Sequence, residues 1–173
     1  FFLLQQIRET PPYIVLSETE EAYRFESGSF ELSPEYMAAL EREVVPRISE
    51  MAHSYKCDVI QVIGHTDGVG MKYRSSNLDE SVMPHLHGIG QDEEPLPGSN
   101  IDLGMLRAIA VARFLESRLA EVEEIRHVLP YSAGPIIGTD GGIRKETGPF
   151  DDRDARRVEL RLTVSGDPVA GRS

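Results

Sequence analysis

Apolar residues recur at steps of three and four in two stretches of the chain, which is the spacing of one face of an α-helix. The first stretch starts at Ser33-Pro34, a good N-cap followed by a good first helical residue. Pro46 lies inside this stretch and predicts a kink or a break, because proline lacks a backbone donor. The second helix is predicted from about 100 to 120, after a capping pattern at Ser99 and Asp102.

Short segments with strand patterns surround these two helices. Val158, Leu160, Leu162 and Val164 alternate with polar residues, which predicts a strand with one buried face. Val59–Ile63 is rich in β-branched residues and predicts a buried strand. Three further segments have strand-like composition: Tyr13–Leu16, Tyr23–Phe25 and His127–Ser132. The predicted order of the main elements is strand, helix, strand, helix, strand, strand.

Two long segments carry no periodic pattern. Residues 70–98 contain Pro84, Pro95 and Pro97, and we interpret them as a long loop or insertion before the second helix. Residues 134–154 form a second long loop, broken by Gly141-Gly142.

Charge excludes several functions. The chain has 173 residues with 29 acidic and 18 basic side chains, and its net charge is −11. Nucleic-acid binding and adhesion to an anionic membrane surface both depend on Lys and Arg, so neither is expected. A zwitterionic or cationic ligand is compatible with this charge. Cys57 is the single cysteine and is interpreted as a small buried apolar residue.

Five separate pieces of the sequence resemble the OmpA/MotB-like C-terminal domain family, which binds peptidoglycan. They occur in the family's order and together span residues 25–162. The pieces are Phe25-x-Ser27-Gly28-Ser29-x-x-Leu32, Gly64-His65-Thr66-Asp67, Asn100-x-x-Leu103-x-x-x-Arg107-Ala108, Ser132-x-Gly134 and Arg156-Arg157-Val158-Glu159-Leu160.

The resemblance implies an α/β (α+β) sandwich of β-α-β-α-β-β order, with two helices on one face of a mixed sheet. We expect an OmpA-like domain over residues 13–164, with an insertion at about 70–98. Residues 1–12 would be a lead-in and 165–173 a tail. Phe1-Phe2-Leu3-Leu4 is interpreted either as the end of a membrane helix or as a loose chain end.

The family's ligand is the diaminopimelate residue of the peptidoglycan stem peptide. Carried over to this sequence, Asp67 pairs with the ligand's ammonium group and Arg107 with its carboxylate. An Asp and an Arg suit a zwitterion, because Arg presents a planar fork to a carboxylate and Asp accepts from an ammonium. The remaining expected pocket residues are Asn100, Thr66, Leu103, Arg157 and Arg156.

The sequence departs from the family pattern between Asp67 and Arg107, where the insertion lengthens the chain. The insertion either folds away from the pocket or covers it. A second Ser-Asn-Leu at Ser76-Asn77-Leu78 competes with Ser99-Asn100 for the aligned position, and we prefer Asn100. Gly104 stands where the family usually has Ser.

The resemblance implies a non-catalytic anchor in the periplasm, with no cofactor, that ties a membrane complex to the cell wall. The motif around Phe25 is closer to the flagellar-stator (MotB) branch, which implies an N-terminal membrane helix in the inner membrane and a proton-channel partner. An outer-membrane tether is the alternative. Two other functions stay open: an interaction or homodimerisation module that has lost wall binding, and a metal-dependent hydrolase using His85, His87, Asp92 and Glu93.

Overall fold

The computed structural model describes residues 10–71, 75–89 and 93–166. Its centre is a mixed sheet of four strands in the order β1-β4-β2-β3. The outer pair β1 (Ile14–Ser17) and β4 (Arg157–Thr163) is antiparallel, as is β4 with β2 (Val59–His65). The other edge strand, β3 (His127–Gly134), runs parallel to β2. The expected mixed sheet is confirmed.

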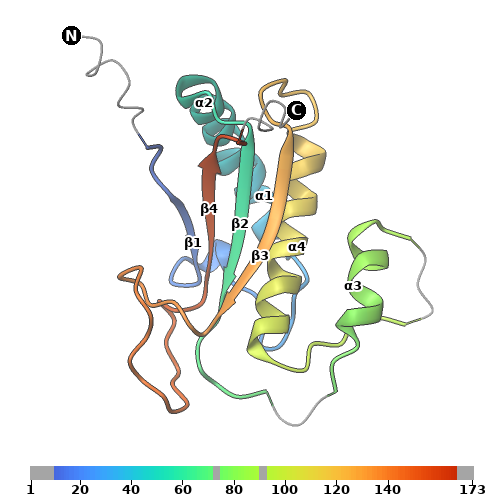
Figure 1. Ribbon diagram of the computed structural model, residues 1–173, viewed down its shortest axis with the longest axis vertical. Coiled ribbons are helices and arrows are strands. Elements are labelled where there is room, and N and C mark those ends of the chain that lie inside the picture. The colour runs from blue at the N-terminus through green and yellow to red at the C-terminus, as the bar shows by residue number, and fades with distance from the viewer. Residues whose placement is uncertain (1–9, 72–74, 90–92, 167–173) are drawn as a thin grey trace, which may run out of the picture.

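The main helices cover one face of this sheet, as Figure 1 shows. The first helical stretch comprises α1 (Pro34–Ala39), a π-helical turn η3 (Leu40–Val44) and α2 (Val45–Tyr55). The second is α4 (Asn100–Arg118). Ile60 and Leu160 from the sheet and Ile48 and Leu115 from the helices are almost fully buried between the two layers. This is the predicted α/β sandwich with a single main core.

Two helix details follow from the sequence. Ser33 caps α1, because its side-chain oxygen accepts a hydrogen bond from the Tyr36 N–H at 3.1 Å. The irregularity expected near Pro46 takes the form of the π-helical turn η3, which immediately precedes the proline-containing first turn of α2.

Two local predictions are wrong. Tyr23 ends a short 3₁₀ helix, η2 (Glu21–Tyr23), instead of starting a strand. Its ring and the ring of Phe25 both pack on Tyr36, so the apolar pattern reflects core packing rather than a sheet ladder. The insertion is not only loop, because it contains α3 (Leu78–Leu86).

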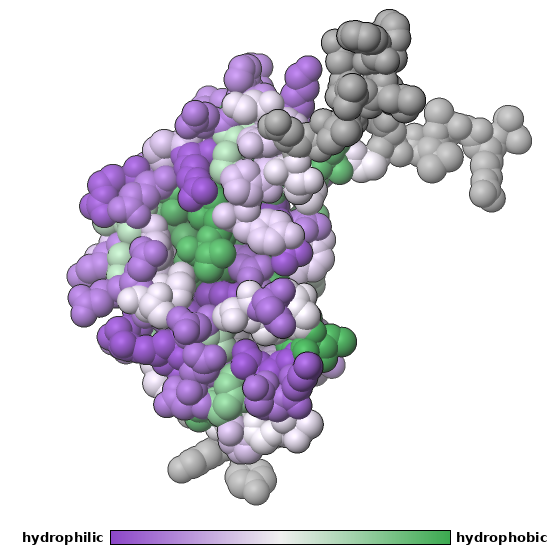
Figure 2. Space-filling model, turned by 90° about the vertical axis from the view of Figure 1, so that its left-hand side faces the viewer, coloured by the Kyte–Doolittle hydropathy of each residue, from purple (hydrophilic) through white to green (hydrophobic). Residues whose placement is uncertain are grey.

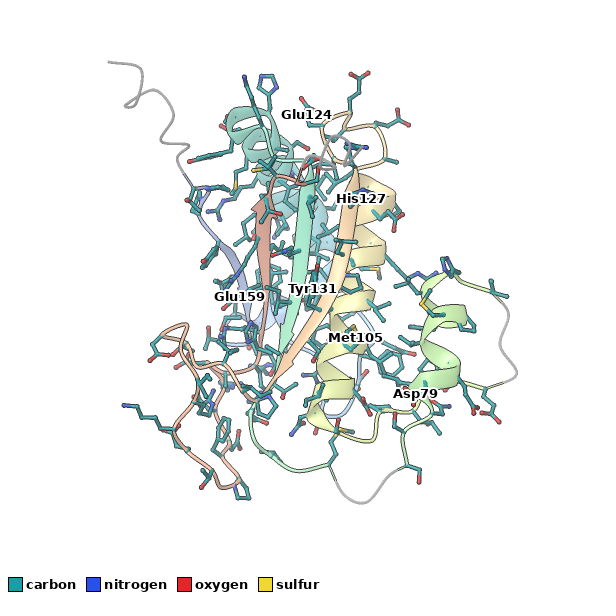
Figure 3. All side chains as sticks on the ribbon, in the orientation of Figure 1. Asp79, Met105, Glu124, His127, Tyr131 and Glu159 are labelled. Atoms are coloured by element: carbon teal, nitrogen blue, oxygen red, sulfur yellow. The ribbon has the colours of Figure 1, made fainter. Side chains whose placement is uncertain are left out.

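Helix α3 rests against α4 at the side of the molecule (Figure 1). Leu78, Val82 and Leu86 recur every four residues and pack with Leu106 and Ile109 in a small second core. Met105, labelled in Figure 3, packs against the same cluster from α4. The four-residue spacing was therefore a usable helical signal that Pro84 concealed.

Helix α4 approaches the sheet very closely at Gly104. A Cβ atom built on Gly64 of β2 would lie 2.0 Å from the Gly104 carbonyl oxygen, and one built on Gly104 would lie 2.6 Å from Ser132 Oγ. The Ser132 hydroxyl donates to the Ile101 carbonyl at 2.6 Å, which fixes the start of α4 on β3. The low helix propensity of Gly104 is thus offset by close packing that seats α4 on the sheet.

Replacing Gly64 should therefore destabilise the domain strongly. We expect Gly64→Ala to lower the free energy of unfolding by about 2 to 3 kcal/mol, because the new methyl group meets backbone atoms that cannot rotate away. Urea unfolding followed by circular dichroism measures the change. Gly148→Ala is the matched control, since no atom lies within 4 Å of its built Cβ. Equal stability of the two variants would contradict this packing.

Candidate functional site

Five chain segments with polar residues meet at one end of the sheet. Strands β1, β2 and β3 end there, while β4 and α4 begin there, at the lower end of the sheet in Figure 1. Glu18 follows β1, Asp67 follows β2 by two residues and Arg156 precedes β4. The topology thus brings together residues that are remote in sequence.

A cavity of about 580 Å³ opens at this end. Its lining includes both charged residues of the predicted pair, Asp67 and Arg107. Four more predicted site residues line the same cavity: Thr66, Asn100, Leu103 and Arg156. A larger cavity of about 740 Å³ lies beside α2 and is lined by Pro12, Arg47 and Tyr55 among others. None of the predicted residues lines it.

Asp67 is 6% exposed, and each of its carboxylate oxygens already has a partner. Oδ1 accepts a hydrogen bond from the Val69 N–H at 3.1 Å, and Oδ2 accepts one from Arg156 Nη1. A carboxylate has about four lone-pair positions, so Asp67 keeps capacity for a further donor. The aspartate is held in place and remains able to accept from an ammonium.

Arg107 is 5% exposed, and backbone carbonyls hold one edge of its guanidinium group. Its Nε donates to the Ser29 carbonyl at 2.9 Å and its Nη2 to the Glu26 carbonyl at 3.3 Å. Its Nη1 lies 3.7 Å from Glu18 Oε1, and its guanidinium stands over the Phe25 ring. Burial lowers the pKa of Arg107, and the Glu18 carboxylate opposes that shift. With five N–H donors and two in these bonds, Arg107 retains donors for a carboxylate.

Arg156 links the carboxylates of the cavity. It donates to Glu18 at 2.7 Å, to Asp151 at 2.7 Å and to Asp67. Burial lowers the pKa of Arg156, but the hydrogen bonds to Asp151, Glu18 and Asp67 outweigh it and raise the pKa above its ordinary value. Arg156 therefore holds together the ends of β1 and β2 and the start of β4.

Arg157 does not line this cavity. Its side chain is 4% exposed and donates to Glu159 at 2.9 Å and to two backbone carbonyls. Glu159, labelled in Figure 3, also lies 3.5 Å from Nε2 of the buried His65 and 3.1 Å from Arg161. These residues form a second charged cluster, which lies within the sheet.

The described part of the insertion does not fill the cavity. Of its described residues, only Gly70 and Met71 contribute to the lining. Asn77 lies elsewhere, where its amide oxygen accepts from Ser81 Oγ and the Leu96 N–H at the start of α3. Asn100 instead donates to the Val69 carbonyl at 2.9 Å at the cavity wall, as expected from its place at the start of α4.

The described candidate metal ligands of the insertion, His85, His87 and Glu93, do not form a metal-binding cluster. Within residues 10–71, 75–89 and 93–166, no three His, Cys, Asp or Glu side chains are grouped to hold a metal ion. Asp92, one of the four candidates, lies outside the described residues, as does the apolar stretch Phe1–Leu4. No helix in the described part of the chain is long and apolar enough to span a membrane.

Several cavity residues had no sequence signal. Glu18 is 5% exposed and pairs with both Arg107 and Arg156, yet its sequence context is only an acidic connection after a strand. Asp151 and Arg153 come from the long loop before β4. That loop is brought to the cavity by a hydrogen bond of 3.0 Å from the Gly68 N–H to the Phe150 carbonyl. Nothing in the local pattern of either segment predicts this contact.

Among the comparisons with known proteins, only the one with solved structures finds matches. No family model and no curated protein matches the sequence. The periplasmic domain of Helicobacter pylori MotB (residues 78-256) is similar in structure, with a TM-score of 0.50 at 15% identity over 91% of this chain and 79% of that one. This chain therefore has an OmpA/MotB-like fold.

Two further solved structures are similar to a lesser degree. A putative MotB-like protein from Desulfovibrio vulgaris has a TM-score of 0.49 at 16% identity, covering 88% of this chain and 75% of its own. The cell wall anchor of the T6SS from Pseudomonas aeruginosa has a TM-score of 0.44 at 17% identity, covering 88% of this chain and 81% of its own.

The charged cluster around Glu159 should make stability depend on acid pH. The nearby His65 ring, whose Nε2 lies 3.5 Å from Glu159, and then Arg157 lower the pKa of Glu159 to about 2 against the opposing effect of burial. A carboxylate with a lowered folded-state pKa stabilises the fold above its unfolded pKa, near 4.5, and this contribution is lost as pH falls toward 2.

The test compares wild type with Glu159→Gln by urea unfolding between pH 7 and pH 2. We expect the variant to be less stable at neutral pH and the difference to shrink progressively below about pH 4.5. A difference that stays constant down to pH 2 would show that Glu159 does not titrate in this way.

Proposed function

We propose that this domain binds peptidoglycan non-covalently by its stem peptide, gripping the ammonium and carboxylate groups of diaminopimelate. The observation that carries the proposal is one cavity lined by a buried carboxylate, Asp67, and a buried guanidinium, Arg107. An amino-acid end carries both charges, so its site needs one fixed partner of each sign. The OmpA/MotB-like fold and the motifs that resemble this family support the same ligand.

The hydrogen bonds of the cavity support a preorganised site. Backbone carbonyls hold one edge of Arg107, and a backbone N–H with Arg156 holds Asp67. Fixed side chains lose little conformational entropy when a ligand binds. The ligand's ammonium would donate to Asp67, and its carboxylate would accept from the spare donors of Arg107, in a cavity that Asn100 at the start of α4 also lines.

The proposed role is an anchor, not an enzyme. His65, the histidine nearest to the site in sequence, is 3% exposed and faces Glu159. We infer that the domain works in the periplasm, tethers a membrane complex to the wall and gains strength from many weak sites along the polymer. An inner-membrane helix preceding the domain and a proton-channel partner belong to this proposal.

The interaction module that has lost wall binding is the competing function. It would be favoured by an insertion that fills the cavity, but the described residues of the insertion lead away to α3. The pairing of Asp67 with Arg156 is the feature that suits this alternative, because an internal guanidinium then occupies the ammonium site. Binding measurements separate the two functions.

The test is a calorimetric titration with a diaminopimelate-containing muropeptide. We expect Asp67→Asn to weaken binding at least tenfold, because a charge-assisted hydrogen bond contributes roughly 1.5 to 3 kcal/mol. The substitution keeps an oxygen that can accept from the Val69 N–H, so the loop should stay folded. Arg107→Lys should also weaken binding, since Lys keeps the charge but lacks the planar fork.

Asp79→Asn is the matched control, because Asp79 lies on α3 (Figure 3) and does not line the cavity. It removes one negative charge and should bind as wild type. Unchanged affinity in both Asp67→Asn and Arg107→Lys would locate the site elsewhere. Absence of binding by the wild type would favour the interaction module.

A further inference from the structure

The charges that line the cavity are not balanced. Four arginines, Arg24, Arg107, Arg153 and Arg156, face three carboxylates, Glu18, Asp67 and Asp151. All three carboxylates pair with Arg156, and Glu18 also faces Arg107. This local excess of positive charge occurs in a chain whose net charge is −11.

Arg24 and Arg153 are the two cavity arginines that pair with none of the three cavity carboxylates. Both are exposed, and neither guanidinium lies within 4.0 Å of a carboxylate in the part of the chain that the structure describes. They come from different segments: Arg24 follows η2, and Arg153 lies in the loop before β4. Asp152 and Asp154 flank Arg153 in sequence, but their carboxylates make no ion pair with it.

We propose that Arg24 and Arg153 form an anion subsite at the cavity rim, which takes a second carboxylate of the ligand. The inference rests on the proposed function and specifies its substrate class: an acidic peptide with a carboxylate on the residue next to the zwitterionic end. The zwitterion brings one charge of each sign, so it leaves the excess of the four arginines unmatched. An additional carboxylate removes that excess.

The contacts of Arg107 and Arg156 support a role for these two arginines that differs from the role of Arg24 and Arg153. Arg107 is held inside by the Ser29 and Glu26 carbonyls, and Arg156 is held by three carboxylates. The exposed Arg24 and Arg153 line the same cavity and have no such restraints among the described contacts. Figure 2 shows one side of the molecule, which is mostly hydrophilic with several separate hydrophobic areas.

The probes are free diaminopimelate and two tripeptides, and the two tripeptides differ from each other by one group. Free meso-diaminopimelate supplies the zwitterionic end without the glutamate, although its second end is also a zwitterion. The tripeptide L-Ala-γ-D-Glu-meso-diaminopimelate adds the free α-carboxylate of the glutamate. The same tripeptide with that carboxylate converted to an amide keeps the size and shape but removes the charge. Calorimetry or NMR titration gives the dissociation constant for each.

We expect the wild type to bind the acidic tripeptide about threefold to tenfold more tightly than the amidated one, a range typical of two solvent-exposed charge pairs. The double variant Arg24→Gln/Arg153→Gln should bind both tripeptides equally, with the affinity that the wild type shows for the amidated one. Arg47→Gln is the matched control, because Arg47 is an exposed arginine of the other cavity, beside α2. It should keep the preference for the acidic tripeptide.

Each other outcome overturns the inference. If the wild type binds free diaminopimelate but does not distinguish the two tripeptides, the anion subsite is wrong and the proposed function stands. If the double variant keeps the wild-type preference, the second carboxylate is bound by other residues. If the wild type binds none of the three probes, the proposed function fails and the subsite fails with it.

Discussion

The pairing of buried charges at one end of the sheet is the constraint on which the site depends. Arg156 joins Asp67, 89 positions earlier in the chain, and Glu18, 138 positions earlier. Breaking a fully buried pair costs about 3 to 5 kcal/mol, and the cost is smaller here because the Arg156 side chain is 23% exposed and water can reach it. The same contacts therefore close this end of the fold and fix the two groups, Asp67 and Arg107, that we propose to bind the ligand.

This double role has a consequence for affinity. A zwitterionic end that lies between Asp67 and Arg107 meets charges that already have partners, so there it gains only from spare lone pairs on Asp67 and spare N–H donors on Arg107. We therefore expect each site to bind the ligand weakly and to exchange it rapidly. A polymer that presents many copies of the ligand compensates for this weakness, which suits an anchor better than a receptor for a free small molecule.

The sequence predicted the parts of the site that lie in or next to helices and strands with a clear hydrophobic pattern. Asp67 follows a β-branched strand and Arg107 lies in an amphipathic helix with a clear cap, so their elements were predictable from local pattern. Glu18 and Arg153 were not, because loops carry no periodicity and only the folded loops bring them to the cavity. Helix α3 was hidden by Pro84, and the reason for Gly104 appears only in its contact with Gly64 and Ser132.

The most direct measurement follows the Nε–H NMR signals of the arginines during titration with free meso-diaminopimelate. The account predicts saturable shifts of Arg107 and Arg156, whose guanidinium groups line the cavity, and no shift of Arg157, which is held by Glu159 away from it. Unmoved signals of Arg107 and Arg156 at millimolar ligand, with the domain folded, would contradict the claim that this charged cavity is the binding site.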